Sequence, residues 1–173
     1  MPKIILIRND YPDNHALLNV LNYAMRSQFY DGYALDPDRA YRQMMMVKNA
    51  YHKVDGVQLL HFIISFSDYE ACILDMNEML DVGWWAAQYF KGFQSVYALH
   101  SDTRHFHLHI VVNTVSFEDG HRYSDGELTF WAMKKGLQEQ FHKSDVGLYR
   151  SYPRSNVNQY MDDEDRDAFL RIG

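Results

Sequence analysis

The chain has 173 residues, 47% of them apolar, and a formal net charge of −6 at pH 7. This length and apolar content suit one compact domain that needs neither disulfides nor structural metals to hold its core. The negative charge argues against indiscriminate binding to nucleic acid, which depends on excess lysine and arginine, but it leaves room for a local basic groove.

Cysteine usage and hydropathy address the cellular setting. Cys72 is the only cysteine, so no internal disulfide can form. The first residues do not form a charged-then-apolar secretory leader, and no apolar run approaches the ~20 residues that cross a bilayer. We therefore expect a cytoplasmic, monomeric protein without a membrane partner.

The beginning of the chain predicts a strand and a helix. Residues 3–8, KIILIR, are rich in isoleucine and precede the polar segment NDYPDN, which indicates a buried strand followed by a turn. Asn14 or the residue before it can cap a helix through NHALLNVLNYAMRSQFY. On this helix Tyr23, Arg26 and Tyr30 share a face away from the apolar stripe. We therefore expect Tyr23 to be presented rather than buried.

The next segments predict two more helices around a central strand. After the turn-like YDGYALDPD, Pro37 can begin a helix through DRAYRQMMMVKNAYHK. Residues 57–66, VQLLHFIISF, are continuous enough in apolar residues for a strand in the middle of a sheet. Residues 71–90, ACILDMNEMLDVGWWAAQYF, then indicate one helix that ends near Gly92.

A hairpin and a last helix are expected after that. Residues 94–100, QSVYALH, and 105–117, HFHLHIVVNTVSF, indicate two strands joined by the tight connection SDTR. The polar loop EDGHRYSDGE leads into an amphipathic helix, LTFWAMKKGLQEQFHK. The folded domain is expected within residues 1–150, and the acidic tail, 151–173, is interpreted as a short helix or an end added to the natural chain.

Histidines are concentrated on the second strand of the hairpin. Side chains alternate along a strand, so His105, His107, His109 and Asn113 share one side, while the apolar residues between them face the other. Neutral imidazole nitrogen is a common ligand for divalent transition metals. A strand that buries its apolar side and aims imidazoles from the other predicts a metal site rather than a row of surface histidines.

His107 and His109 need a third ligand from nearby. His100, at the end of the preceding strand, is the preferred candidate, and His105 competes because simple hairpin pairing sets it roughly opposite His100. Asp102 could accept an imidazole N–H and fix its tautomer, or it could only cap the turn. Three histidines leave open positions on an ion, which favours a catalytic site over a closed structural one. Zinc hydrolysis, oxygen chemistry and phosphoryl transfer all remain open on these residues alone.

The run HSDTRHFHLHIVVNTVSFEDGHRYSD, residues 100–125, resembles the metal motif of the HUH (histidine, hydrophobic, histidine) endonucleases, and closely that of the relaxases and mobilisation nucleases. In that family a His-x-Asp pattern precedes His-x-His, a strand ending in Asn, and a loop with Asp-Gly, two basic residues and Tyr. The segment LNYAMR is similar to the first motif of the family, where a tyrosine on an early helix is the nucleophile. The resemblance covers about residues 3–150, although SFSDYE lacks the glycine expected before Glu70.

The resemblance implies an α/β (α+β) domain with a ferredoxin-like palm, in which helices flank a central, largely antiparallel sheet. It implies a conjugative relaxase in which Tyr23 attacks one DNA strand at a transfer origin, holds it as a 5′-phosphotyrosine and later reseals it. It also implies a divalent ion on His100, His107 and His109, with Mn²⁺ or Mg²⁺ first and Zn²⁺, Co²⁺ or Ni²⁺ as alternatives. The implied partners, in the bacterial cytoplasm, are single-stranded or hairpin origin DNA, accessory relaxosome proteins and a coupling protein.

Several polar residues have weaker signals. His105 and Asn113 are candidates to replace or orient a metal ligand. The candidates for DNA contact could equally be solvated or, on the central strand, buried in the core: Arg26, His61, Arg122, Lys134 and Lys135.

Three rival functions have other signatures. A replication initiator or transposase of the same superfamily carries its nucleophilic tyrosine on a helix after the histidine motif, whereas the helix expected at residues 128–143 contains no tyrosine. A metal-dependent hydrolase would let water attack and form no covalent adduct. A catalytically silent DNA-binding module would keep the metal only for structure.

Overall fold

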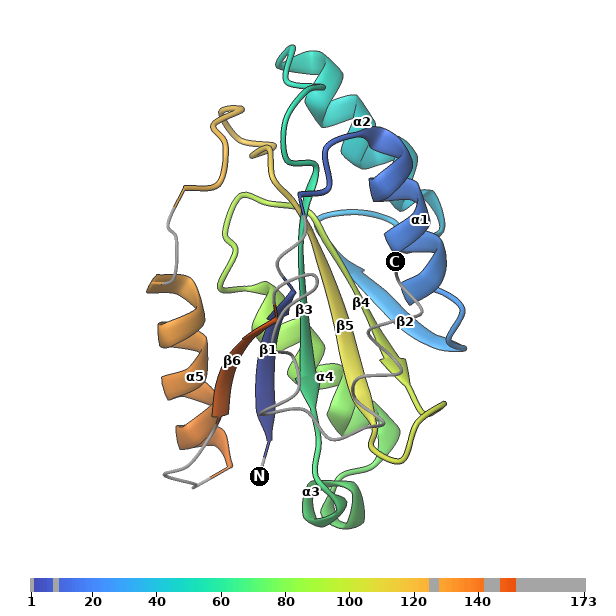
Figure 1. Ribbon diagram of the computed structural model, residues 1–173, viewed down its shortest axis with the longest axis vertical. Coiled ribbons are helices and arrows are strands. Elements are labelled where there is room, and N and C mark those ends of the chain that lie inside the picture. Colours follow the sequence, from blue (N-terminus) through green and yellow to red (C-terminus); the bar gives the residue numbers. More distant parts are fainter. Residues whose placement is uncertain (1, 8–9, 125–127, 142–146, 152–173) are drawn as a thin grey trace.

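The structure, a computed structural model, describes residues 2–7, 10–124, 128–141 and 147–151 (Figure 1). Six strands form a single sheet, and helices pack against both of its faces. The strands are β1 (Lys3–Ile7), β2 (Phe29–Tyr33), β3 (Leu59–Ser65), β4 (Ser95–His100), β5 (His107–Asn113) and β6 (Gly147–Ser151). The helices are α1 (Asn14–Ala24), α2 (Ala40–Ala50, preceded by the 3₁₀ turn Pro37–Arg39), α3 (Asp68–Ile73), α4 (Met76–Ala87) and α5 (Leu128–Gln140).

The order of strands across the sheet is β2-β4-β5-β3-β1-β6. Neighbouring strands from β2 to β1 are antiparallel, and only β6 runs parallel to its neighbour β1. The predicted α+β fold with a largely antiparallel central sheet is therefore confirmed. Of the predicted tail, 151–173, all but Ser151 lies outside the described residues.

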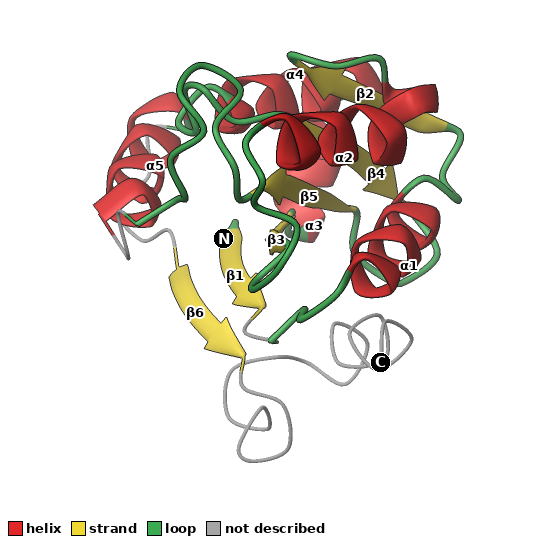
Figure 2. Ribbon diagram, turned by 90° about the horizontal axis from the view of Figure 1, so that it is seen from above, coloured by secondary structure: helices red, strands yellow, loops and turns green. Residues whose placement is uncertain are grey.

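Two apolar cores lie on the two faces of the sheet. Figure 2 shows α4 and α1 on opposite sides of the strands. On one face Ile63 of β3 and Val111 of β5 pack with Leu17 of α1. On the other face Phe62 and Ile110 belong to the core that α4 and α5 cover. Successive residues of a strand point to opposite faces, so each central strand contributes to both cores.

The strand β5 has the alternation that the sequence predicts. Its apolar residues Leu108, Ile110 and Val112 face α4 and α5, while His107 and His109 face the side of α1. Both histidines are buried, with 1% and 0% of their surface exposed. They are therefore interior side chains, which excludes the alternative of a row of surface histidines.

The first predicted helix is too long. It ends at Ala24, and its capping residue Met25 donates its N–H to the carbonyl of Leu21. The edge strand β2, in which Phe29 pairs with Leu99, covers the end of this predicted helix and the start of the segment interpreted as a turn. Because the pairing partner lies far along the chain, no local pattern could reveal this strand.

The helix predicted for residues 71–90 is two helices. Leu74 has an extended backbone conformation, with φ −108° and ψ 137°. The side chain of Asp75 then accepts hydrogen bonds from the N–H groups of Asn77 and Glu78, and Glu78 reaches back to the N–H of Asp75. This capping box starts α4, and its Asp-x-x-Glu spacing was a readable signal of a new helix.

No helix among the described residues has the length and apolar character that a membrane span requires.

Candidate metal centre and nucleophile

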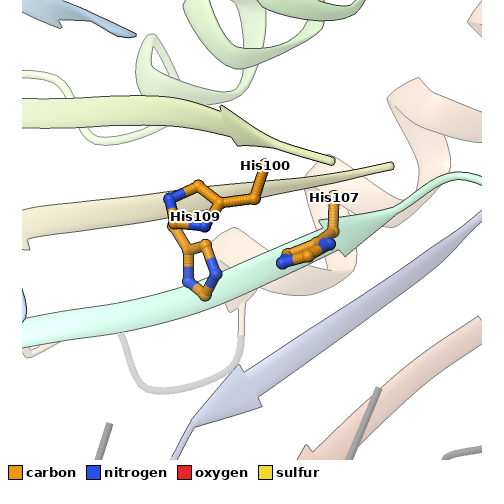
Figure 3. A group of neighbouring side chains, drawn as sticks. All are labelled: His100, His107 and His109. Carbon is orange, nitrogen blue, oxygen red and sulfur yellow. The ribbon is translucent and has the colours of Figure 1, made fainter. Parts of the chain in front are cut away.

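Three buried histidines converge where β4 ends and β5 begins (Figure 3). Antiparallel pairing sets His100 opposite His107 and Ala98 opposite His109. Each ring offers one nitrogen, and these three nitrogens all lie within 4.8 Å of one another. The geometry follows from the strands, because residues two apart on β5 share a face and the register brings His100 beside them.

His105 does not join this group. The predicted hairpin is confirmed, because β4 and β5 pair, but its connection is longer than expected: β5 begins only at His107, and residues 101–106 form the connection. The N–H of Phe66 binds the carbonyl of Phe106, and Nδ1 of His105 lies 3.2 Å from a carboxylate oxygen of Asp68 on α3. Pairing therefore selects His100 as the third histidine of the cluster and directs His105 to another partner.

Hydrogen bonds to carbonyl oxygens fix the tautomers of two histidines. Nε2 of His100 lies 2.7 Å from the carbonyl oxygen of Ala24, and Nδ1 of His107 lies 3.0 Å from the carbonyl oxygen of His105. A carbonyl can only accept, so both ring nitrogens must carry the proton. Nδ1 of His100 and Nε2 of His107 are thereby the atoms with a lone pair for a metal.

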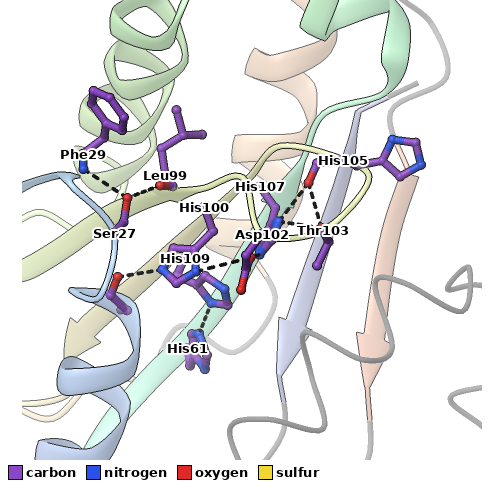
Figure 4. A network of polar contacts seen from close by, with 11 residues as sticks. Ser27, Phe29, His61, Leu99, His100, Asp102, Thr103, His105, His107 and His109 are labelled. Carbon is purple, nitrogen blue, oxygen red and sulfur yellow. Dashed lines mark hydrogen bonds and ion pairs between the residues drawn. The ribbon is translucent and has the colours of Figure 1, made fainter.

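His109 is held by a chain of buried side chains (Figure 4). Its Nδ1 lies 3.0 Å from Nε2 of His61, and Nδ1 of His61 lies 3.2 Å from the hydroxyl of Tyr11. Nε2 of His109 is buried and has no hydrogen-bond partner among the described residues. A buried polar atom in that state is costly unless a ligand satisfies it, so the donor set fits a divalent ion.

Burial keeps the imidazoles neutral. It lowers the pKa of His61 to about 3, with the nearby His100 adding to the effect. The pKa of His109 also falls well below its usual range because of burial first, and then because of His61, His107 and His100. Neutral imidazole is the form that binds metal, so His109 is ready for coordination at ordinary pH, and His61 stays neutral as its hydrogen-bond partner.

Asp102 lies beside the cluster in the connection between β4 and β5. One of its carboxylate oxygens is 3.8 Å from Nδ1 of His100 and 3.8 Å from Nε2 of His107. These distances exceed a hydrogen bond, but they place a negative charge next to the two nitrogens that have a lone pair. The carboxylate would favour a cation at the cluster by charge attraction.

Tyr23 packs directly against the histidines. Its ring centroid lies 5.1 Å from that of His109, edge to face, and 5.4 Å from that of His100. Tyr23 is only 6% exposed, so the expectation that the helix presents it to solvent is wrong. The reason is that this face of α1 covers the polar end of the sheet, where the neighbours are imidazoles rather than apolar side chains.

A cavity of about 480 Å³ opens beside Tyr23. Its other lining residues come from the α1–β2 connection and from the end of β4: Arg26, Ser27, Gln28, Phe29, His100, Ser101 and Asp102. Arg26 is exposed, and its guanidinium carbon lies 5.8 Å from the Tyr23 ring centroid. The cavity therefore borders Tyr23 and one histidine of the cluster, His100.

Two of the predicted site residues lie at the opposite end of β5. The side-chain amide of Asn113 donates to the carbonyl of Met44 and to Gln94. The guanidinium of Arg122 donates to the carbonyl groups of Lys53, Asp55 and Val57. Both side chains fasten loops there, and the structure does not bring them to the histidine cluster.

Other predicted residues also lie away from the cluster. Lys134 and Lys135 are on α5, which covers the other face of the sheet, and the Lys134 ammonium lies 5.1 Å from the Trp131 ring centroid. Lys143, another basic residue of the late sequence, lies outside the described residues. His61, in contrast, joins the cluster as a buried partner of His109.

Sequence reasoning missed Tyr11 and Phe29. Tyr11 lies in a polar turn, and only the folded chain brings its hydroxyl to His61. Phe29 was expected at the end of the first helix but lies on strand β2, so its place beside the cavity had no signal. His61 did carry a signal in the sequence. It lies two residues from Ile63 on the predicted strand, so the two side chains share the face that points toward α1.

Fold and site together define an α+β domain with a three-histidine centre and a tyrosine packed on it. The sequence profile of the MobA/VirD2-like relaxase nuclease domain matches residues 20–145. The chain belongs to this relaxase family, as its motifs predicted.

Two curated relatives agree with that assignment. Two Staphylococcus aureus proteins, both called protein rlx, are 30% identical over 109 residues, which is 62% of this chain. The chain spans about a third of their length, 33% and 34%.

Two solved structures share the fold. The MobM relaxase domain bound to a 26-nucleotide pMV158 oriT DNA superimposes with a TM-score of 0.55 at 15% identity, covering 95% of this chain and 97% of that one. A structure that addresses the molecular basis of vancomycin resistance transfer in Staphylococcus aureus gives 0.53 at 12% identity, covering 88% and 100%.

Proposed function

We propose that the protein nicks one DNA strand at a transfer origin with Tyr23 as the nucleophile, and later rejoins the strand. The observation that carries the proposal is the packing of the Tyr23 ring against His100 and His109, two members of the histidine cluster. Membership of the relaxase family and the DNA-bound state of the MobM domain support DNA as the substrate.

A tyrosine suits a reaction that must be reversed. The phenol releases its proton to solvent as its oxygen attacks the scissile phosphorus, the bond to the 3′-oxygen breaks, and that oxygen leaves as a 3′-hydroxyl after taking up a proton from solvent, so no net proton is consumed. The strand is then held as a 5′-phosphotyrosine, which keeps the energy of the phosphodiester where attack by water would lose it. Attack by the 3′-hydroxyl on this adduct restores the strand and frees Tyr23.

The histidines have a separate task. His100, His107 and His109 would hold a divalent ion, which neutralises charge on a non-bridging phosphate oxygen. We favour Mn²⁺ or Mg²⁺, and three imidazoles also accept Zn²⁺, Co²⁺ or Ni²⁺. The protein would contribute orientation, because α1 holds Tyr23 beside the cluster and the neighbouring cavity borders Tyr23 and His100.

The partners follow from this role. We propose single-stranded or hairpin origin DNA as the ligand, with accessory relaxosome proteins and a secretion-channel coupling protein acting on the same complex in a bacterial cytoplasm. The placement of the tyrosine argues against a replication initiator or transposase, since α5 carries no tyrosine while α1 places Tyr23 at the histidines.

The test is a search for the covalent adduct. Single-stranded oligonucleotides that tile the DNA around the gene are incubated with the protein and Mn²⁺, and products are separated on a denaturing gel. We expect one oligonucleotide to give a protein–DNA adduct with the wild type and with Tyr30→Phe, but not with Tyr23→Phe. Tyr30 is a matched control because its hydroxyl binds Asp38 at 2.7 Å. Cleavage without an adduct would instead favour a hydrolase.

A further inference from the structure

Arg26 follows Tyr23 by three residues, in the turn that ends α1, and shares its cavity. The backbone N–H of Arg26 donates to the carbonyl of Tyr23 at 3.2 Å, so one turn carries both residues. The guanidinium carbon of Arg26 lies over the Tyr23 ring, 5.8 Å from the ring centroid. Both side chains line the cavity of about 480 Å³ beside the histidine cluster. The turn therefore brings a permanent positive charge to the proposed nucleophile.

This turn is anchored to β4 on both sides of Arg26. Before it, the carbonyl oxygen of Ala24 lies 2.7 Å from Nε2 of His100. After it, the hydroxyl of Ser27 donates to the carbonyl of Leu99 (Figure 4). Because both partners belong to the end of β4, these bonds hold the backbone of Arg26 at a set position beside the histidine cluster.

The guanidinium of Arg26 is available to a ligand. The residue is exposed, and within the described part of the chain its side chain forms no ion pair or hydrogen bond. In contrast, the guanidinium of Arg104 lies 3.5 Å from a carboxylate oxygen of Asp68, and that of Arg122 donates to three backbone carbonyls. A guanidinium that lies over an aromatic ring still presents the N–H donors at its edge. Arg26 can therefore bind an anion without giving up an ion pair.

The charges around the cavity suit a phosphate once the histidines hold an ion. Asp102 lines the cavity, and its carboxylate lies 3.8 Å from a nitrogen of His100 and 3.8 Å from one of His107. A divalent ion on the histidines would outweigh the single negative charge of Asp102, so the loaded cluster would attract a phosphate rather than repel it. Arg26 adds a second cation to the same cavity.

We propose that the guanidinium of Arg26 binds the scissile phosphate together with the ion-loaded histidine cluster, and that Arg26 is thus a catalytic residue beside Tyr23. The inference rests on the proposed function and adds which side chain of the protein holds the reacting phosphate. A planar guanidinium can donate two parallel N–H bonds to two non-bridging oxygens. Donors aimed at these oxygens stabilise the transferring phosphoryl group in the transition state as well as the bound strand.

The first measurement locates the phosphate that Arg26 binds. The oligonucleotide that forms the adduct is made with a neutral methylphosphonate in place of one phosphate at a time near the nick. Its affinity for Tyr23→Phe, which should bind DNA without cleaving it, is measured by fluorescence anisotropy in Mn²⁺. We expect the methylphosphonate at the nick to weaken binding about 10- to 100-fold, the range for lost hydrogen bonds to a charged group. Adding Arg26→Gln should reduce this loss to less than about 5-fold at the nick and leave the losses at other positions unchanged.

The second measurement follows the rate of adduct formation at saturating DNA. Arg26→Gln should slow it about 100- to 1000-fold, as removal of one donor to a transition-state oxyanion does. Arg26→Lys keeps the charge but loses the planar pair of donors, so we expect a rate between those of the wild type and Arg26→Gln. The matched control is Arg42→Gln, which removes the same charge from an exposed position on α2 and should leave both measurements unchanged.

Two results would overturn the role of Arg26. In one, Arg26→Gln forms the adduct at the wild-type rate. In the other, the methylphosphonate at the nick weakens binding equally with and without Arg26→Gln. Either result leaves the proposed function intact, because Tyr23 still forms the adduct. A wild type that forms no adduct with any oligonucleotide would instead overturn the proposed function, and the role of Arg26 with it.

Discussion

Nε2 of His61 lies 3.0 Å from Nδ1 of His109 in the fully buried centre of the sheet. If Nε2 of His109 binds a metal, then its Nδ1 carries the proton and His61 must accept it. The proton of His61 then lies on Nδ1, which points to the hydroxyl of Tyr11. One metal bond would thus set the direction of two successive hydrogen bonds.

We predict that His61→Phe weakens Mn²⁺ binding about 10- to 100-fold, because partners that orient a metal-binding histidine typically matter by that factor. Phenylalanine keeps a ring in the core but cannot accept the proton of His109. Titration calorimetry measures the affinity, and Tyr11→Phe should show a smaller loss in the same direction. Unchanged affinity in His61→Phe, with Tyr30→Phe as the control, would contradict this role.

The choice between His100 and His105 can be tested in the same way. We predict that His100→Ala abolishes the visible absorption of bound Co²⁺, since only two imidazoles remain, whereas His105→Ala retains it. His105 instead neighbours Asp68, 67% of whose side chain is exposed, so its loss should cost less than about 1 kcal/mol of stability. Loss of the Co²⁺ spectrum in His105→Ala alone would reverse the assignment.

Lys48 gives the stability of the fold a dependence on pH. It is fully buried, and its ammonium nitrogen donates to the carbonyl of Gln58 at 2.8 Å and to the hydroxyl of Thr114 at 3.4 Å. Burial first, and the charge of Arg122 second, lower the pKa of Lys48 from its usual 10.5 to about 7. Between about pH 7 and pH 10.5, therefore, Lys48 is protonated in the unfolded chain but has lost its proton in the folded chain.

We therefore compare the free energy of unfolding of the wild type with that of Lys48→Met. We predict that the wild-type value, relative to the variant, rises with pH between about 7 and 10.5 and does not change with pH below 7. Urea unfolding of both proteins from pH 6 to pH 10 measures it, and comparison with the variant removes the contribution of other groups. Parallel curves over the whole interval would show that Lys48 keeps its proton in the folded state.

Gly83 of α4 is required by close packing. A Cβ atom at this position would lie 2.6 Å from Cδ2 and 3.0 Å from Cγ of Tyr97, which is 2% exposed on β4. Alanine normally stabilises a helix interior relative to glycine by about 0.5–1 kcal/mol. We predict that Gly83→Ala instead destabilises the protein by about 1–3 kcal/mol in chemical denaturation, and that adding Tyr97→Leu recovers part of the loss.

The parts of the fold that the sequence predicts well are those with a strong local period. The alternation around Leu108 and Ile110 located both faces of β5, and with them two histidines of the cluster. The edge strand β2 was missed because its stability comes from pairing with β4, and its Asp31-Gly32 pair is typical of a turn. The break at Leu74 was missed although the capping signal that follows it was present.

The sequence predicted which residues lie at the site better than it predicted their contacts and burial. The strand period placed His107 and His109, but only the register of the hairpin could decide between His100 and His105. The burial of Tyr23 was misjudged because an aromatic residue off the apolar stripe was assumed to face solvent. Contacts such as that of Tyr11 with His61 join distant segments, and a single sequence does not show them.

The bond between His100 and the carbonyl of Ala24 ties the last turn of α1 to the end of β4. Carbonyl groups in the last turn of a helix have no partner within it, so the imidazole meets a need of the helix while the helix sets its tautomer. Tyr23 is the neighbour of Ala24. On the proposed mechanism, fraying of this one turn would release Tyr23 and misalign His100 in the same event, so a half-open form would be inert rather than a stray nuclease.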